Sequence, residues 1–369
     1  MSFPRPDTRL HVSTTAPDPE ERGRQRGAAL AGVLPAAIEA YDRLFAAGGV
    51  ATATVRSDAA RALDAIAAHR TGLAEQIVGI AEAAGVDVWR VAALNARTEI
   101  LARSRTIAPG ECSTIVRSLP GADGIRNVGV QTWDWHVELS DHWHTVDAGG
   151  GAHRYAGITE HGILAKIGVN SAGVALHFNI LGHTQDGVGG IPMHVLAALV
   201  LEEATDADHA VELVREAPIS SSGSFMIFDR DRAVLLDLSP VGVFEAPAVL
   251  PGTRVRTNHF LTAQPAAAEK STYQPDSGER YGFLVGRLAA SAPQSPDHLL
   301  AQLITGEGEP ALTCVPKADA ALGERWASLA TVVLDPAECE ARVLDGTPAE
   351  HASRPWRTLR ATEDALAIV

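Results

Sequence analysis

The spacing of apolar residues changes once along this chain, at Gly110, and this change constrains the fold more than any other feature. From Pro17 to about Arg105, apolar residues recur at helical intervals in an alanine-rich sequence, which predicts helices. From Cys112 to about Ile180, short apolar runs alternate with turn residues at the spacing of β-hairpins. A helical N-terminal segment is therefore followed by a strand-rich one.

Local signals divide both parts further. We expect three helices in the N-terminal segment, with Ser57 or Asp58 and then Asp87 as N-cap residues of the second and third. Two more helices are expected at about 192–203 and 206–217, and a hairpin turn lies at 229–232 between later strands.

The order of these elements predicts the fold class. Strands dominate residues 112–260 and helices bracket or interrupt them, so we expect an α+β fold with four layers. Two largely antiparallel sheets would pack face to face with helices outside. Because no linker or repeat divides the chain, residues 1–111 and 112–369 are expected to form one domain.

Composition excludes several classes of protein. The 369 residues include 45 acidic and 31 basic side chains, for a formal net charge of −14, and no basic patch is visible, so nucleic acid is not an expected partner. The first 25 residues contain no continuous apolar run of signal-peptide length, and no later stretch has the length of a spanning helix. We therefore expect a cytoplasmic protein with no membrane partner. Three cysteines, Cys112, Cys314 and Cys339, are too few and too widely spaced for a disulfide framework or a zinc ribbon.

Cys112 stands at the boundary between the two segments, directly after the loop 107–111. A lone cysteine is usually a small buried apolar residue, so the surrounding motifs decide its meaning. These motifs are NARTEI at 95–100, GECST at 110–114, QTWDWH at 131–136, NSAGVALHFN at 170–179, SSSGSFMIFD at 220–229 and RTNHF at 256–260. Over roughly residues 20–345, the chain resembles the isopenicillin N acyltransferase (acyl-CoA:6-aminopenicillanic acid acyltransferase) family of N-terminal nucleophile hydrolases.

The resemblance implies the αββα fold and a precursor that cleaves itself between Glu111 and Cys112. The Cys112 thiolate would attack the Glu111 carbonyl and shift the acyl group from nitrogen to sulfur, and water would then release residues 1–111. The new α-amino group of Cys112, with an ordinary pKa of about 7.7–8.0, can act as the general base, so neither a catalytic histidine nor a cofactor is needed. The apolar helical faces of residues 1–111 indicate that this fragment stays bound.

Two further residues acquire catalytic roles from the resemblance. It places Asn258 in an oxyanion hole together with the backbone around Asp134, and it places the Asp134 carboxylate beside the α-amino group of Cys112. Asp134 lies between two tryptophans on a predicted strand, where an acidic residue is unfavourable unless it is paired or functional. Structural roles stay open for both: Asn258 as a turn cap and Asp134 as a buried acceptor of backbone hydrogen bonds.

Four residues are weaker candidates for substrate binding. Ser113 and Thr114 directly follow the nucleophile and can form hydrogen bonds near the processing junction. Trp133 belongs to a tryptophan-rich region suited to hold a ligand. Arg325 precedes a late strand, as an arginine precedes the corresponding strand in the family. It would contact a substrate carboxylate, and a role as a surface arginine is equally open.

The chain departs from the family pattern in two places. Glu111 stands where the penicillin enzyme has glycine, which more easily adopts a strained scissile peptide, although Gly110 can supply flexibility. Slow or incomplete maturation is therefore open. The stretch GADGIR at 121–126 lengthens the first hairpin.

The expected function is hydrolysis or transfer of an acyl group at an amide bond through a thioester on Cys112. The substrate would be a small-molecule amide or acyl donor, and the sequence does not distinguish water from an amine or acyl-CoA as second reactant. Histidines crowd residues 136–194, and His142 and His144 would share one strand face, but no metal-ligand motif accompanies them and no metal is expected. Two alternatives are a non-processing protein that binds a small molecule and a Cys–His peptidase that works as an intact chain.

Overall fold

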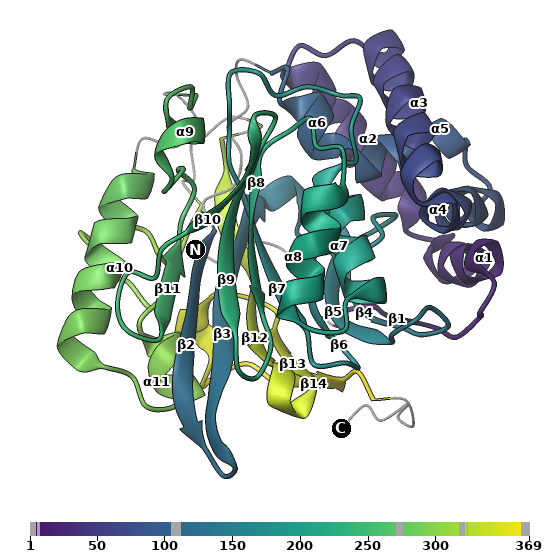
Figure 1. Ribbon diagram of the computed structural model, residues 1–369. Helices are drawn as coiled ribbons and strands as arrows, with labels where there is room; N and C mark the ends of the chain where they lie inside the picture. The colour runs from purple at the N-terminus through teal and green to yellow at the C-terminus, as the bar shows by residue number, and fades with distance from the viewer. Residues whose placement is uncertain are drawn as a thin grey trace.

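The computed structural model describes residues 5, 8–104, 112–270, 276–316, 322 and 324–362. Within these ranges, the chain forms an eight-stranded and a six-stranded sheet with helices packed outside them (Figure 1). Neighbouring strands run antiparallel except for the parallel pair β1 and β4. This architecture confirms the predicted α+β fold.

The eight-stranded sheet has the order β1-β4-β5-β6-β7-β8-β9-β10 and the six-stranded sheet the order β11-β2-β3-β12-β13-β14. The strands of the first are β1 His11–Thr14, β4 Trp143–Ala148, β5 Tyr155–Glu160, β6 Ile167–Asn170, β7 Ala175–Ile180, β8 Gly223–Phe228, β9 Ala233–Ser239 and β10 Gly242–Ala246. Those of the second are β2 Ser113–Gly121, β3 Gly124–His136, β11 Thr253–Arg256, β12 Trp326–Asp335, β13 Glu340–Leu344 and β14 Trp356–Arg360. The turn predicted at 229–232 joins β8 to β9.

The N-terminal segment contains more elements than predicted. Its described residues form six helices instead of three: α1 Pro19–Leu30, α2 Leu34–Ala47, α3 Thr52–His69, α4 Thr71–Ala84, α5 Val88–Asn95 and α6 Arg97–Leu101. They also contribute β1, so the segment is not purely helical. The extra helices arise because single residues interrupt the pattern, such as Arg70, whose φ of −146° separates α3 from α4.

The predicted N-caps had different outcomes. Asp87 is the N-cap residue of α5, as predicted. Ser57 and Asp58 do not begin a helix, because α3 runs through both of them. Asp58 is buried there and accepts hydrogen bonds from Arg103 at 2.6 and 3.0 Å. An ion pair and not a cap therefore accounts for its position.

Helices cover the outer faces of both sheets. Helices α7 Met193–Glu203 and α8 Ala207–Glu216, close to their predicted ranges, lie by the larger sheet (Figure 1). Helices α10 Ser277–Ser291 and α11 Pro296–Ala301 pack on the smaller one, and α9 Ala263–Ala266 precedes them. Between the sheets, the rings of Trp133 on β3 and Trp143 on β4 meet edge to face with centroids 5.8 Å apart. The main hydrophobic core contains residues from the N-terminal helices and from both sheets.

The β2–β3 hairpin leads to the candidate nucleophile. Its pairing runs from Ser113 opposite Thr132 to Gly121 opposite Gly124, and Gly124 has a φ of +108° that favours glycine. The hairpin tip, which contains the GADGIR stretch at 121–126, extends beyond the rest of the sheet (Figure 1).

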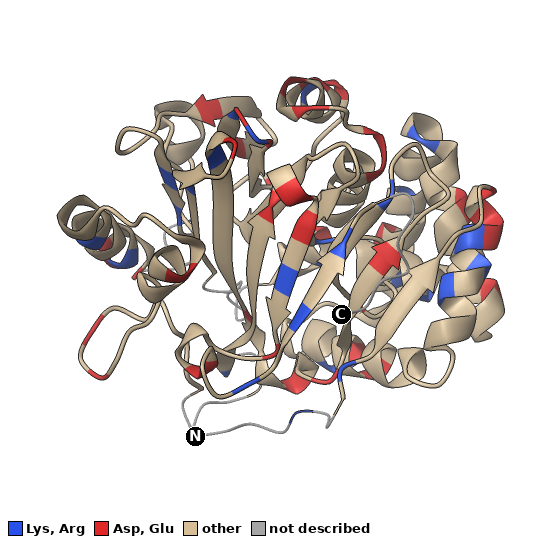
Figure 2. Cartoon of the chain, turned by 90° about the horizontal axis from the view of Figure 1, so that it is seen from below, with Lys and Arg blue, Asp and Glu red and all other residues tan. Residues whose placement is uncertain are grey.

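Acidic and basic residues are interspersed along helices and strands in the view of Figure 2. Within the described part of the chain, no helix has both the length and the apolar composition that crossing a membrane requires.

Candidate active site

Cys112 lies one residue before β2 and is 4% exposed. Its Sγ atom accepts a hydrogen bond from the backbone N–H of Asp134 at 3.4 Å and lies 3.6 Å from the Asp134 carbonyl oxygen. Burial, followed by the nearby Asp134 charge, raises the pKa of the Cys112 thiol to about 12. In the intact chain the thiol is therefore protonated, and it requires a base to react.

The carbonyl oxygen of Cys112 accepts hydrogen bonds from two buried side chains. Asn179 Nδ2 donates to it at 2.9 Å and Arg280 Nη1 at 3.5 Å. Thr114 Oγ1 donates in turn to Asn179 Oδ1 at 2.7 Å. These bonds fix the backbone of Cys112 from two directions. Neither Asn179 nor Arg280 was predicted as a site residue.

Asp134 is fully buried on β3, opposite Ser328 of β12. Its backbone N–H points at the Cys112 sulfur, and Thr132 Oγ1 lies 3.4 Å from its Oδ2. Thr132 Oγ1 also accepts the N–H of Ser113 at 3.2 Å. The structure thus brings Asp134 and Cys112 together, with the backbone donor directed at the nucleophile.

Asn258 follows β11 and is 3% exposed. Its Nδ2 donates to the Ile180 carbonyl at 3.0 Å, and its Oδ1 accepts from Arg280 Nη2 at 3.2 Å. Its backbone N–H donates to Ser277 Oγ at 2.7 Å. A carboxamide has two N–H donors, and Ile180 takes one of them. Arg280 therefore connects Asn258 to Cys112 and holds the carboxamide with its oxygen toward the guanidinium.

The four residues predicted to bind substrate lie in different environments. Ser113 and Thr114 are fully buried beside Cys112, where Ser113 Oγ accepts from Arg280 at 3.1 Å. Trp133 is 1% exposed and packs in the core between the sheets. Arg325 forms an ion pair with Glu138 and its side chain is 39% exposed. Glu111 lies outside the described residues.

A buried group of charged side chains contacts the rings of Trp133 and Trp135. Glu160 Oε1 accepts from Arg97 at 2.5 Å and from Lys166 at 2.9 Å, and Glu160 Oε2 accepts from the Tyr41 hydroxyl. The Lys166 ammonium lies 4.9 Å from the Trp133 ring centroid.

The buried carboxylate and ammonium titrate in unusual ranges. Burial alone raises the pKa of the Glu160 carboxyl, but Arg97 and Lys166 outweigh it and bring that pKa to about 2. Burial lowers the pKa of Lys166 to about 8 although Glu160 opposes the shift. This group of charges was not predicted from the sequence, although Arg97 stands in one of the quoted motifs.

The crowded histidines do not form a metal centre within the part of the chain that the structure describes, where no three side chains of His, Cys, Asp or Glu are arranged to hold a metal ion. The rings of His144 and His161 lie 5.3 Å apart, and both side chains are buried. Burial holds their pKa values below the ordinary range, which keeps both rings neutral.

Sequence comparisons identify the family of the chain. Residues 122–350 match the family described as Acyl-coenzyme A:6-aminopenicillanic acid acyl-transferase. The 40 kDa form of acyl-coenzyme A:6-aminopenicillanic-acid-acyltransferase from Emericella nidulans is 29% identical over 280 residues, which cover 74% of this chain and 75% of that protein.

Solved structures with a similar arrangement are more distant. An N-acylethanolamine-hydrolyzing acid amidase orthologue from Caenorhabditis elegans has 14% identity and a TM-score of 0.43, covering 61% of this chain and 93% of its own. A mutant conjugated bile acid hydrolase from Clostridium perfringens has 10% identity and a TM-score of 0.44, covering 69% and 94%. Penicillin V acylase from Agrobacterium tumefaciens has 10% identity and a TM-score of 0.39, with the same coverage.

The family match spans more than half of the chain and includes Asp134 and Asn258. It confirms the family and the enzyme class that the sequence motifs indicated. The chain belongs to the acyl-coenzyme A:6-aminopenicillanic acid acyl-transferase family.

Proposed function

We propose that this enzyme is a self-processing N-terminal cysteine amidohydrolase or acyltransferase, with Cys112 as its nucleophile. The observation that carries the proposal is the 3.4 Å contact between the Asp134 backbone N–H and Sγ of Cys112, the residue directly before β2. A donor at that position can stabilise negative charge that develops beside the sulfur. The family membership of the chain supports the same chemistry.

In the processing step, Cys112 Sγ attacks the carbonyl carbon of Glu111. The C–N bond between the two residues breaks as the C–S bond forms, and the thiol proton ends on the departing nitrogen. Water then hydrolyses the thioester, which leaves a carboxylate on Glu111 and a free α-amino group on Cys112. The reaction needs no cofactor because every proton and electron pair comes from the chain or from water.

In the catalytic step, the α-amino group of Cys112 accepts the thiol proton as sulfur attacks the substrate carbonyl, and it passes that proton to the leaving amine. The Asp134 N–H and the second Nδ2–H of Asn258 are the proposed oxyanion donors, and Arg280 sets the orientation of the Asn258 carboxamide. The Asp134 carboxylate is the proposed partner of the α-amino group.

The proposed substrates are small molecules that present an acyl group as an amide or an acyl-coenzyme A thioester. The Emericella nidulans relative carries acyl-coenzyme A and 6-aminopenicillanic acid in its name. Water as second reactant gives an amidohydrolase, and an amine gives an acyltransferase. For the weaker candidates, Ser113 and Thr114 are proposed to support the junction through their hydrogen bonds, and Arg325 to bind a carboxylate at the surface.

Contacts between the two segments support retention of residues 1–111 after cleavage. Strand β1 pairs along its whole length with β4. Arg26 donates to the Leu164 carbonyl at 2.7 Å, and Asn95 donates to the Gly162 carbonyl at 2.8 Å. Arg26 and Asn95 are both buried. Separating the two fragments would therefore expose apolar surface and remove the donors of the Leu164 and Gly162 carbonyls.

The contacts of Cys112 disfavour the Cys–His alternative. Among the described residues, the hydrogen-bonding partners of Cys112 Sγ are the backbone N–H and C=O of Asp134, and no imidazole is one of them. The intact chain therefore has no histidine base at its thiol within the described ranges.

Intact mass measurement of the purified, denatured protein tests the proposal. The parent should give fragments of 111 and 258 residues, whereas Cys112→Ala should give one uncut chain. Cys314→Ala is the matched control, because Cys314 is also buried, and it should be cut like the parent. If the parent stays uncut and Glu111→Gly does not restore cleavage, self-processing is contradicted. That result would favour the alternative of a non-processing protein that binds a small molecule.

A further inference from the structure

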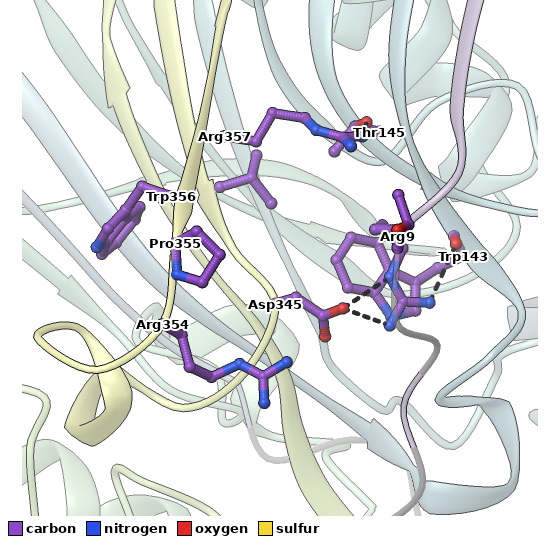
Figure 3. Close-up of a pocket in the computed structure, with 10 residues that line it drawn as sticks. Arg9, Trp143, Thr145, Asp345, Arg354, Pro355, Trp356 and Arg357 are labelled. Atoms are coloured by element: carbon purple, nitrogen blue, oxygen red, sulfur yellow. Dashed lines mark hydrogen bonds and ion pairs between the residues drawn. The ribbon is translucent and has the colours of Figure 1, made fainter. Parts of the chain in front are cut away.

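A cavity away from Cys112 has the chemistry of an anion site. Its volume is about 220 Å³, and it lies between β4, β13 and β14 and the N-terminal residues Thr8 and Arg9. Figure 3 shows Arg9 beside Asp345 and Trp143, and Arg357 extending toward Thr145. None of Cys112, Asp134 and Asn258 lines this cavity.

Three arginines and one carboxylate line the cavity. Arg9 is neutralised by Asp345, because its Nε and Nη2 donate to Asp345 Oδ2 at 3.0 and 2.9 Å. Its guanidinium also lies 3.9 Å from the Trp143 ring centroid and donates to the Ser140 carbonyl at 2.9 Å. Arg9 is therefore part of the wall and has little capacity left for a ligand.

Arg357 has a different environment. Its Nη1 donates to the neutral Thr145 hydroxyl at 2.6 Å, and no carboxylate lies within 4.0 Å of it among the described residues. Arg354 reaches Glu350 only at 3.8 Å, and Arg5 already holds that carboxylate at 2.9 and 3.1 Å. The cavity thus presents two guanidinium groups whose charge is not matched in its lining, in a chain with a formal charge of −14.

Apolar residues form much of the remaining wall, together with Thr8 and Thr145. Trp143, Val343 and Pro355 face the same cavity as the arginines. A guanidinium fork binds carboxylate and phosphate through paired N–H donors, and apolar walls favour a ligand body without charge. We propose that this cavity binds a small organic anion, in which a carboxylate or phosphate group on Arg357 is joined to an apolar or aromatic body.

The proposal is tested on the full-length protein by isothermal titration calorimetry at low ionic strength with benzoate, phenyl phosphate, inorganic phosphate and benzamide. Benzoate or phenyl phosphate should saturate one site, and the tighter of the two identifies the anion. Benzamide has the shape of benzoate without its charge and should bind at least about tenfold more weakly. Inorganic phosphate lacks the apolar body and should also bind more weakly than phenyl phosphate.

Variants locate the site. Arg357→Met should weaken binding of the preferred anion at least about tenfold, whereas Arg357→Lys, which keeps the charge, should bind more tightly than Arg357→Met. Arg360→Gln is the matched control, because Arg360 lies on the same strand, is exposed and pairs with Glu340 outside the cavity. The circular dichroism spectrum of each variant checks that it is folded. Equal binding of benzamide and benzoate, equal affinity of folded Arg357→Met and parent, or no saturable binding of any anion would overturn the proposal.

Discussion

Arg280 offers the sharpest test of how the site is held together. Its side chain is fully buried on α10 and donates to Ser113 Oγ at 3.1 Å and to Asn258 Oδ1 at 3.2 Å. Arg280→Met keeps much of the side-chain length but removes these donors, together with the longer bond of 3.5 Å to the Cys112 carbonyl, which Asn179 still serves. An acceptor left buried without a partner costs about 1–3 kcal/mol, so the two together predict a loss of about 2–6 kcal/mol in the free energy of unfolding. The ion pair with Asp276, whose side chain is 36% exposed, adds at most about 1 kcal/mol.

The same substitution should slow the reaction. Without Arg280, the Asn258 carboxamide loses the donor to its Oδ1 atom that the described residues supply and is freer to rotate. Loss of one oxyanion donor typically costs about 10²–10³ in rate. Urea denaturation measures the stability, and mass spectrometry follows the appearance of the two fragments with time.

Arg287→Met is the matched control for this experiment. Arg287 lies on the same helix and donates to the carbonyls of Ile304 and Ala301. Neither of these partners is a residue of the candidate site. It should leave the fragmentation rate unchanged. An Arg280→Met variant whose stability and fragmentation rate both match those of the parent would refute the positioning role.

Three further predictions follow from the site and its surroundings. Asn258→Ala should slow acylation of Cys112 by about 10²–10³ in single-turnover kinetics while the protein stays folded, and an unchanged rate would remove Asn258 from the oxyanion hole. Glu160→Gln leaves two buried cations without their carboxylate and should lower the free energy of unfolding by about 3–5 kcal/mol in urea, whereas exposed Glu39→Gln should not. Burial lowers the pKa of His177 to about 3, below its unfolded value of about 6.5, so the unfolded chain binds more protons between these pH values and stability falls as pH decreases through that window. His177→Gln should flatten the pH dependence of the urea midpoint by up to about 1.4 kcal/mol per pH unit, and exposed His298→Gln should not.

Elements that local rules determine could be predicted from the sequence. The β2–β3 hairpin, helices α7 and α8 and the turn at 229–232 follow from residue spacing and turn chemistry over a few positions. The pairing of β1 with β4 could not be predicted in this way, because it joins strands about 130 residues apart in parallel orientation. A four-residue strand gives too little alternation to identify it without its partner.

The residues of the candidate site also differ in whether they could be predicted from the sequence. The family resemblance predicted that Asp134 lies beside Cys112, and the pairing of β3 with β2, which begins directly after Cys112, brings the two residues together. Arg280 was missed, although a signal was present: Arg280, Leu284 and Leu288 recur every four residues on α10, and all three are buried. An arginine on the apolar face of a helix needs acceptors in the core, so this spacing indicates a buried hydrogen-bonding role.

The motif at 95–100 precedes the proposed cleavage point, and its Arg97 belongs to the buried group of charges. Cleavage would leave Arg97 on one fragment and Glu160 on the other, with a 2.5 Å ion pair joining them in a fully buried place. Separating the fragments would leave buried charges without their partners or require both to be rehydrated while apolar surface is exposed, so the pair opposes dissociation. The Arg97 guanidinium also lies 4.2 Å from the ring centroid of Trp135, the residue next to Asp134. Residues on the released fragment would thus continue to hold the strand whose backbone N–H is directed at Cys112.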